Sequence, residues 1–103
     1  IYDGEGNAEA LAEDVGRHNA VDKVIGSSAL DHTDFNTCFL ALSGRLTGDI
    51  VHKAARAGLP IVASLAAAID SGITIARATG LTILGFVRGN RMNIYTFPER
   101  ILW

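Results

Sequence analysis

Three short apolar runs alternate with two segments of helical spacing between residues 37 and 87. The runs cover residues 37–42, 61–65 and 82–87, and Gly58 and Gly80 end the two helical segments. A strand–helix–strand–helix–strand order with short connections implies right-handed crossovers and parallel strands. Near-continuous apolar runs are typical of strands that are covered on both faces. The alternation therefore predicts a parallel sheet with helices on its faces.

The flanking segments predict antiparallel strands and one more helix. Residues 88–91 form a short turn that returns the chain into a last strand, 92–97, antiparallel to its predecessor. At the start, residues 1–2 and 8–15 are expected to form a hairpin around a glycine-rich connection. A helix follows Gly16, with one apolar stripe. The whole chain is then one α/β sandwich with mixed strands.

Composition restricts the class of protein. The 103 residues suit a single domain. A net charge of -2 gives no general attraction to nucleic acid or to an anionic membrane. The apolar stretch 59–69 is far shorter than a bilayer span, and because residues 1–7 are neither basic nor followed by an apolar run, we expect no secretory signal. Because the first residue is not methionine, we expect the sequence to be a piece of something longer.

The single cysteine and the scattered histidines argue against a metal. Cys38 alone cannot form an internal disulfide or a multi-thiolate zinc site, and its place within an apolar strand predicts a buried, inert thiol. The three histidines, His18, His32 and His52, show neither HxxxH nor HxH spacing. Metal sites usually need such clustered ligands. We therefore predict no metal site.

The stretch EDVGRHNAVDK, residues 13–23, concentrates seven polar side chains around Gly16. Asp14 or Asn19 is suited to cap the helix, which is an ordinary structural role. If the helix has begun by His18, then His18 and Asp22 share one side, and Asp22 is placed to orient the imidazole or raise its pKa. A capped helix needs about two of these residues. The remaining polar residues favour a ligand site over a solvated helix start.

Ser43-Gly44-Arg45 follows the first long strand. Ligands of open α/β sheets bind beyond the carboxyl ends of parallel strands, where helix N-termini also gather. Charge-assisted hydrogen bonds contribute roughly 1.5–3 kcal/mol, against about 0.3–1 kcal/mol for a helix dipole. Arg45 would therefore dominate an anion site here. A plain turn with a solvated arginine is the alternative, since a lone SGR motif is weak.

Several motifs occur together in one order along the chain. They are EDVGRHNAVDK (13–23), SGR (43–45), KAARAGLPIV (53–62), GLTILGFVRGNRMNIYT (80–96) and FPERI (97–101). Together they resemble the formate dehydrogenase accessory sulfurtransferase family, FdhD, and the likeness covers nearly the whole chain.

The resemblance implies a cytoplasmic protein that accepts sulfur from a cysteine desulfurase. Such a protein passes the sulfur to the molybdenum (or tungsten) bis-molybdopterin guanine dinucleotide cofactor, so that formate dehydrogenase becomes active. It also implies a cytidine-deaminase-like, three-layer α/β/α sandwich and a homodimer. Deaminase chemistry and its zinc are not implied, because HxE and PCxxC are absent.

The family's sulfur-carrying CxxC loop lies upstream of the hairpin and has no counterpart here. The resemblance therefore implies that residues 1–103 are a C-terminal, cofactor-binding domain without catalytic residues of its own. A non-catalytic nucleotide-binding or phosphate-binding assembly module is the alternative function.

Two turns, each leading into a helix, are expected to meet at a common rim and hold the cofactor. Gly16 to His18 and Ser43 to Arg45 would bind pyrophosphate, and Asp14 and Asp22 would accept hydrogen bonds from guanine. The residues that we expect to hold the cofactor are Asp14, Gly16, Arg17, His18, Asn19, Asp22, Lys23, Ser43, Gly44, Arg45 and Arg91.

Overall fold

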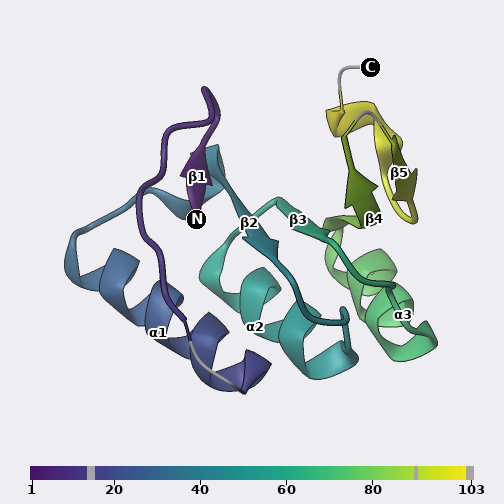
Figure 1. Ribbon diagram of the computed structural model, residues 1–103, viewed down its shortest axis with the longest axis horizontal. Helices are drawn as coiled ribbons and strands as arrows, with labels where there is room; N and C mark the ends of the chain where they lie inside the picture. The colour runs from purple at the N-terminus through teal and green to yellow at the C-terminus, as the bar shows by residue number, and fades with distance from the viewer. Residues whose placement is uncertain (14–15, 90, 102–103) are drawn as a thin grey trace.

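The structure is a computed structural model that describes residues 1–13, 16–89 and 91–101, apart from the side chains of Arg17 and His18. The chain forms one five-stranded sheet in the order β1–β2–β3–β4–β5 (Figure 1). The strands are β1 (Tyr2–Asp3), β2 (Cys38–Leu42), β3 (Ile61–Ser64), β4 (Thr82–Arg88) and β5 (Arg91–Ile94). Strands β2, β3 and β4 are parallel, while the edge strands β1 and β5 are antiparallel to their neighbours. The mixed α/β sheet predicted from the sequence is confirmed.

The helices are α1 (Arg17–Leu30), α2 (Gly48–Ala57) and α3 (Asp70–Thr79), with short 3₁₀ turns η1 (Phe35–Thr37) and η2 (Pro98–Arg100). Local sequence signals mark the start of α2 and the ends of α2 and α3, whereas α1 and α3 begin without a side-chain cap. The Thr47 hydroxyl accepts a hydrogen bond from the Ile50 amide at 3.4 Å and so caps α2. Gly58 and Gly80 end α2 and α3 with φ of 93° and 76°, a left-handed conformation that glycine adopts most easily. Within the described ranges, no helix combines the length and apolar character needed to cross a membrane.

Two predicted strands are shorter than expected. The second arm of the N-terminal hairpin is reduced to a single bridge between Tyr2 and Ala8, because Tyr2 pairs mainly with Phe39 of β2. The last strand ends at Ile94 instead of residue 97. Beyond it, the buried Thr96 hydroxyl accepts from the Ile83 amide (3.0 Å) and donates to the Leu81 carbonyl (2.7 Å). Side-chain hydrogen bonds thus replace strand pairing at this end of β4.

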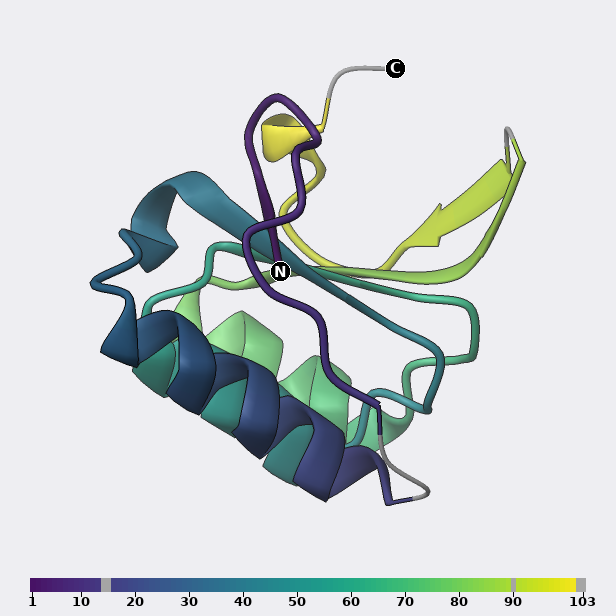
Figure 2. The ribbon, with the colours of Figure 1, turned by 60° about the vertical axis from the view of Figure 1, so that its left-hand side comes forward.

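All three helices lie on one face of the sheet (Figure 2). The chain steps from β2 to β3 to β4 in one direction, and right-handed crossovers then place α2 and α3 on the same side. Buried strand residues such as Leu40, Val62 and Ile83 form one core with Ile50 and Val51 of α2. The described residues therefore build two layers. The prediction that residues 37–42 are covered on both faces is not met within them.

The connection after β1 is organised by the Asp3 carboxylate. Its Oδ1 accepts hydrogen bonds from the amides of Glu5 and Asn7, both at 2.9 Å, and its Oδ2 accepts from the Asn7 side-chain amide at 3.2 Å. These bonds, the backbone bond from Asn7 foremost, hold the pKa of Asp3 below its ordinary value of 3.8.

The lowered pKa of Asp3 predicts that the hairpin loosens in acid. The ionised form is favoured in the folded state, so the stabilisation is complete above pH 3.8 and is lost as the pH falls through the folded pKa. An NMR titration should give an Asp3 midpoint below 3.8, with the Glu5 and Asn7 amide signals moving in the same step. In Asp3→Asn the Glu5 and Asn7 amide signals should show no such step. If Asp3 in the unmodified chain titrates with a midpoint at or above 3.8, the hydrogen-bond assignment is contradicted.

Candidate functional site

A cavity of about 280 Å³ lies between the N-terminal segment, α1 and the carboxyl end of β2. Its polar wall includes Glu13 and Ser43, and its apolar wall includes Ala20 and Val24 of α1 and Leu42 of β2. The turn after β2 and the first half of α1 therefore line one cavity. This is the end of the sheet where α/β proteins bind ligands.

The Ser43–Thr47 loop is fastened to the loop that follows β3. The buried Ser64 hydroxyl donates to the Gly44 carbonyl at 2.6 Å and accepts from the Ala66 amide at 3.0 Å. The Leu46 amide donates to Ala67, and the Leu46 carbonyl accepts from Ile69. Both loops are thereby held in one arrangement.

Arg45 projects from this fastened loop. Its neighbour Leu46 is fully buried, whereas the Arg45 side chain is exposed. In the part of the chain that the structure describes, no carboxylate forms an ion pair with Arg45. Ser43 of this loop lines the cavity, whereas Arg45, two residues further along, does not. An exposed guanidinium on a fixed loop is suited to bind a phosphate group that extends beyond the cavity.

The polar residues of α1 point in different directions. The Asp22 carboxylate accepts a hydrogen bond from Lys53 of α2 at 3.0 Å, and Asp22 does not line the cavity. Lys23 instead reaches the N-terminal segment and donates to the Glu13 carbonyl at 3.4 Å. Asn19 is exposed. Lys23 thus lies close to the cavity wall, while Asp22 joins two helices.

Three predicted contacts lie outside the described residues. Asp14 is not described, nor are the side chains of Arg17 and His18. Their assignment to cofactor binding, and the pairing of His18 with Asp22, therefore stay predictions. Gly16 is the N-cap of α1, and its φ of -98° is extended backbone that other residues also adopt.

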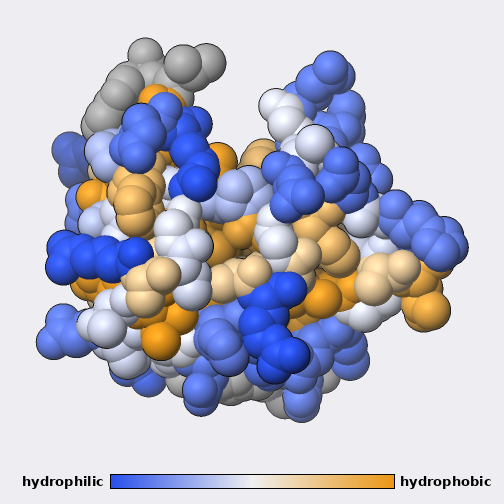
Figure 3. Space-filling model, turned by 180° about the vertical axis from the view of Figure 1, so that it is seen from behind, coloured by the Kyte–Doolittle hydropathy of each residue, from blue (hydrophilic) through white to orange (hydrophobic). Residues whose placement is uncertain are grey.

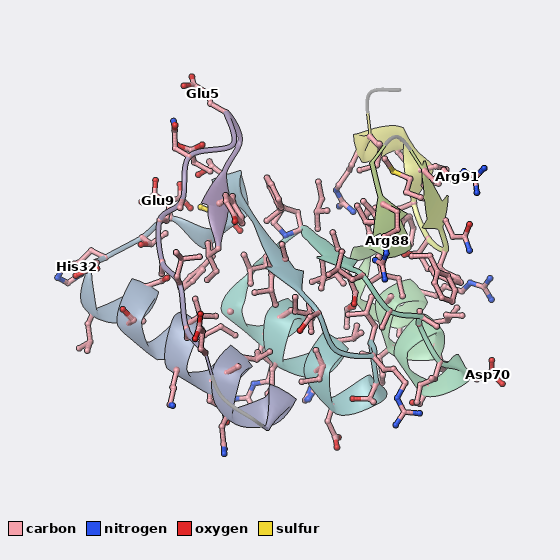
Figure 4. All side chains as sticks on the ribbon, viewed as in Figure 1. Glu5, Glu9, His32, Asp70, Arg88 and Arg91 are labelled. Carbon is pink, nitrogen blue, oxygen red and sulfur yellow. The ribbon has the colours of Figure 1, made fainter. Side chains whose placement is uncertain are left out.

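Arg91 is separated from the other candidates. It lies on the edge strand β5, with three strands between it and β1. Figure 4 shows Arg88 and Arg91 on the β4–β5 hairpin, on the other side of the molecule from α1. Arg91 therefore does not line the cavity between α1 and β2.

Glu13 is a residue whose role the sequence did not reveal. It belongs to the polar stretch, but nothing in its spacing distinguished it from its neighbours. Only the tertiary structure identifies it, because the segment after β1 passes α1 and brings Glu13 to the wall of the cavity that Ser43 also lines. A carboxylate there is able to accept N–H groups from a ligand.

Cys38 is buried, as predicted, with 4% of its surface exposed. Its thiol contacts the Asp34 carbonyl at 3.4 Å. In residues 1–13, 16–89 and 91–101, no three side chains of His, Cys, Asp or Glu come together as metal ligands.

The sequence matches the FdhD/NarQ family over residues 1–102. The chain belongs to this family. The likeness to FdhD inferred from the sequence motifs is thereby confirmed. The curated relatives of this FdhD/NarQ chain include proteins named sulfur carrier protein FdhD from two archaea. The protein from Methanothermobacter thermautotrophicus is 55% identical over 97 residues, which are 94% of this chain and 39% of the relative.

The Thermoplasma acidophilum relative is 49% identical over 102 residues, which are 99% of this chain and 36% of the relative. A solved structure, described as a putative formate dehydrogenase accessory protein from Desulfotalea psychrophila, superposes with a TM-score of 0.83 at 45% identity. The superposition covers 88% of this chain and 41% of that structure. The FdhD/NarQ chain thus has the fold of the matched part of that solved structure, and it spans about two fifths of the length of these proteins.

Proposed function

We propose that this chain is the cofactor-holding part of a sulfur carrier that serves formate dehydrogenase in the cytoplasm. In this proposal a homodimeric full-length protein takes sulfur from a cysteine desulfurase and delivers it to the molybdenum or tungsten bis-molybdopterin guanine dinucleotide. The names of the relatives support the sulfur-carrier role. The cavity lined by α1 and by Ser43, the first residue of the Ser43–Thr47 loop, is the observation that supports cofactor binding.

The size and donor set of the cavity suit one nucleotide portion of that cofactor. A volume of about 280 Å³ is at the small end of ligand pockets, which range over roughly 300–1,000 Å³. Arg45, two residues beyond the lining residue Ser43, and Lys23, which reaches the lining residue Glu13, are the cations that would hold a pyrophosphate outside the cavity. Glu13 supplies a carboxylate for the N1–H and N2–H groups of guanine, and Asp14 is retained as a second candidate. GDP is therefore a suitable probe of this cavity.

The sulfur-accepting step is not assigned to this chain. A persulfide-forming cysteine must be accessible and present a thiolate, whereas Cys38 is buried in β2. We assign that step to the CxxC loop of FdhD-type proteins, which the motif resemblance places in the part of the relatives that this chain does not match. This division of labour predicts that the 103-residue chain binds nucleotide but does not transfer sulfur.

Arg45→Ala should weaken GDP binding by about 10- to 100-fold, because one charge-assisted hydrogen bond contributes roughly 1.5–3 kcal/mol. Calorimetric titration gives the dissociation constants. In a thermal-shift assay, GDP at about 100 times its dissociation constant should stabilise the unmodified chain by about 2.7 kcal/mol. Arg56→Ala is the matched control, since Arg56 is an exposed arginine in the last turn of α2. Equal weakening by both changes, or no GDP binding at all, would contradict the proposed site.

Glu13→Gln should reduce the preference for GDP over ADP by about 10-fold, since an amide oxygen is a weaker acceptor than a carboxylate for two guanine N–H groups. Asp22→Asn serves as the comparison, because that carboxylate faces Lys53 of α2. Competition titrations with GDP and ADP measure the preference. If it is unchanged in Glu13→Gln, guanine is not recognised through this residue.

The buried position of Cys38 also favours a second candidate, a non-catalytic nucleotide-binding assembly module. The two functions differ in the full-length context. A chimera in which this chain replaces the matched 97 residues of the Methanothermobacter relative should acquire a persulfide when incubated with a desulfurase and cysteine. GDP binding without any persulfide would favour the assembly module.

A further inference from the structure

A second cavity, of about 320 Å³, lies beside the cavity of the candidate site. The two cavities share Ala41, Leu42 and Ser43, the residues at the carboxyl end of β2. Residues 63–65 at the end of β3 and Val87 of β4 complete the wall of the second cavity. Figure 3 shows the molecule from behind, with hydrophobic residues in the hollow between two lobes. The end of β2 therefore forms a common wall of two neighbouring cavities.

The short length of β1 explains why the cavities meet at β2. In the part of the chain that the structure describes, β1 pairs with Cys38 and Phe39, and its register stops before Ala41. The carboxyl half of β2 is therefore an edge of the described sheet. A molecule is able to pass around such an edge from one face to the other, with Ser43 at the point of passage. The two cavities are thus placed to hold the two ends of one ligand.

The walls of the second cavity are apolar. Its floor is formed by Ala41 and Ala63, which alternate along their strands with the core residues Leu40 and Val62 and so lie on the opposite face of the sheet. Leu65, which is 46% exposed, lines the wall. Among the described residues that line this cavity, none is acidic or basic. Such walls suit the apolar faces of a flat ring and disfavour an unpaired charge.

An exposed aromatic residue follows the strand next to this cavity. Phe86 directly precedes the lining residue Val87 and is 48% exposed. Its amide donates to the Ala66 carbonyl at 3.0 Å, and its φ is 51°. A bulky residue in this conformation is strained, and such strain is concentrated at binding sites. Phe86 thus adds, one residue from the cavity wall, the kind of side chain on which bases stack.

We propose that the second cavity binds a flat heteroaromatic ring that is joined through pyrophosphate to the guanine of the first cavity. The ligand class is then a dinucleotide with a ring at each end, and not a mononucleotide or a nucleotide sugar. Ser43 lines both cavities, and Arg45 lies two residues further along the same loop, where it is suited to bind the pyrophosphate between the rings. This inference rests on the proposed nucleotide site and extends it to the other end of the ligand.

Three probes separate the second ring from the rest of the ligand, namely GDP, GDP-mannose and diguanosine pyrophosphate. The last two carry the same pyrophosphate charge, but diguanosine pyrophosphate has a second flat ring where GDP-mannose has a sugar. Calorimetric titration of the 103-residue chain gives the dissociation constants. Diguanosine pyrophosphate should bind about 10-fold more tightly than GDP-mannose, because stacking of one base typically contributes at least this much.

Two results of these titrations would overturn the inference, and they differ in what they leave standing. Equal affinity for diguanosine pyrophosphate and GDP-mannose, with GDP still bound, would remove the second ring site and keep the nucleotide site. Absence of binding by all three probes would remove the nucleotide site and this inference together.

Leu65→Asp tests whether the second cavity is responsible for the preference. It places a carboxylate in the apolar wall, at an exposed position where substitutions seldom disturb folding. It should lower the affinity for diguanosine pyrophosphate about 10-fold more than the affinity for GDP. Leu30→Asp is the matched control, since Leu30 is 83% exposed at the end of α1 and should affect both probes equally.

Ala63→Leu tests the same cavity by filling its floor, and urea denaturation shows whether each variant remains folded. It should also reduce the preference for diguanosine pyrophosphate over GDP-mannose. An undiminished preference in both Leu65→Asp and Ala63→Leu would overturn the assignment of the second ring to this cavity.

Discussion

Gly72→Ala is expected to destabilise the chain by about 3 kcal/mol, the upper part of the range for overpacking a close contact. A Cβ atom at Gly72 would collide with the carbonyl oxygen of Leu46 and would also crowd Val51. Leu46 is fully buried, and its carbonyl accepts the Ile69 amide, so this backbone has no room to move aside. For a domain of about 100 residues, such a loss lowers the melting temperature by about 15 °C.

Gly26→Ala is the matched control for this prediction. Gly26 lies within α1, and a Cβ there would meet nothing within 4 Å. Alanine in the interior of a helix is favoured over glycine by about 0.5–1 kcal/mol, so this variant should be slightly stabilised. Urea denaturation of both variants gives the free energies of unfolding. If Gly72→Ala loses less than 1 kcal/mol, α3 does not pack as closely on Leu46 as the structure shows.

Ser64→Ala is expected to cost about 2–3 kcal/mol, although it removes a single oxygen atom. Ser64 is 2% exposed, and its hydroxyl joins the Gly44 carbonyl to the Ala66 amide. Without it, two partly buried backbone groups lose their partner, and each such loss costs roughly 1–3 kcal/mol when the group is buried. Because Gly44 lies between Ser43 and Arg45, we also expect weaker GDP binding.

Ser27→Ala, at an exposed position of α1, is the control for Ser64→Ala. It shows whether removing any serine hydroxyl lowers the stability. It should change the free energy of unfolding by less than about 0.5 kcal/mol. Denaturation and GDP titration of both variants complete the comparison. Normal stability of Ser64→Ala would show that the hydroxyl does not hold the two loops together.

Gly72→Ala and Ser64→Ala both disturb the same two loops, which follow β2 and β3. Leu46 and Ala68 form a parallel bridge, and the Leu46 amide donates to Ala67. This pairing continues the register of the two strands beyond their ends and fixes the direction in which Arg45 leaves the loop. The stability of the fold and the position of Arg45, the residue expected to bind an anion, therefore depend on the same contacts.

Local sequence signals determined the secondary structure. Thr47 caps α2, Gly58 and Gly80 end α2 and α3, and the three apolar runs became β2, β3 and β4. The helix ends depend on interactions within a few residues, such as a hydroxyl reaching an amide or a glycine adopting positive φ. The strands pair with residues about twenty positions away, but their apolar runs made them recognisable in the sequence. The order of these elements and the crossover rule were enough to predict a mixed α/β sheet.

The membership of the candidate site was decided only by tertiary structure. Asp22 and Lys23 are neighbours in the chain, yet one contacts Lys53 of α2 and the other reaches Glu13. Arg91 was grouped with Arg45 but lies on the far edge strand, because strand order is not encoded in local spacing.

The exposed face of the sheet shows the same limit. Residues 37–42 carry the apolar pattern of a strand covered on both sides, and that pattern records the preference of each side chain for burial. Which element satisfies that preference depends on packing between segments far apart in sequence. The sequence by itself thus determined the helices and strands and the α/β fold class. The tertiary structure determined which residues share a cavity and which face of the sheet the described helices leave uncovered.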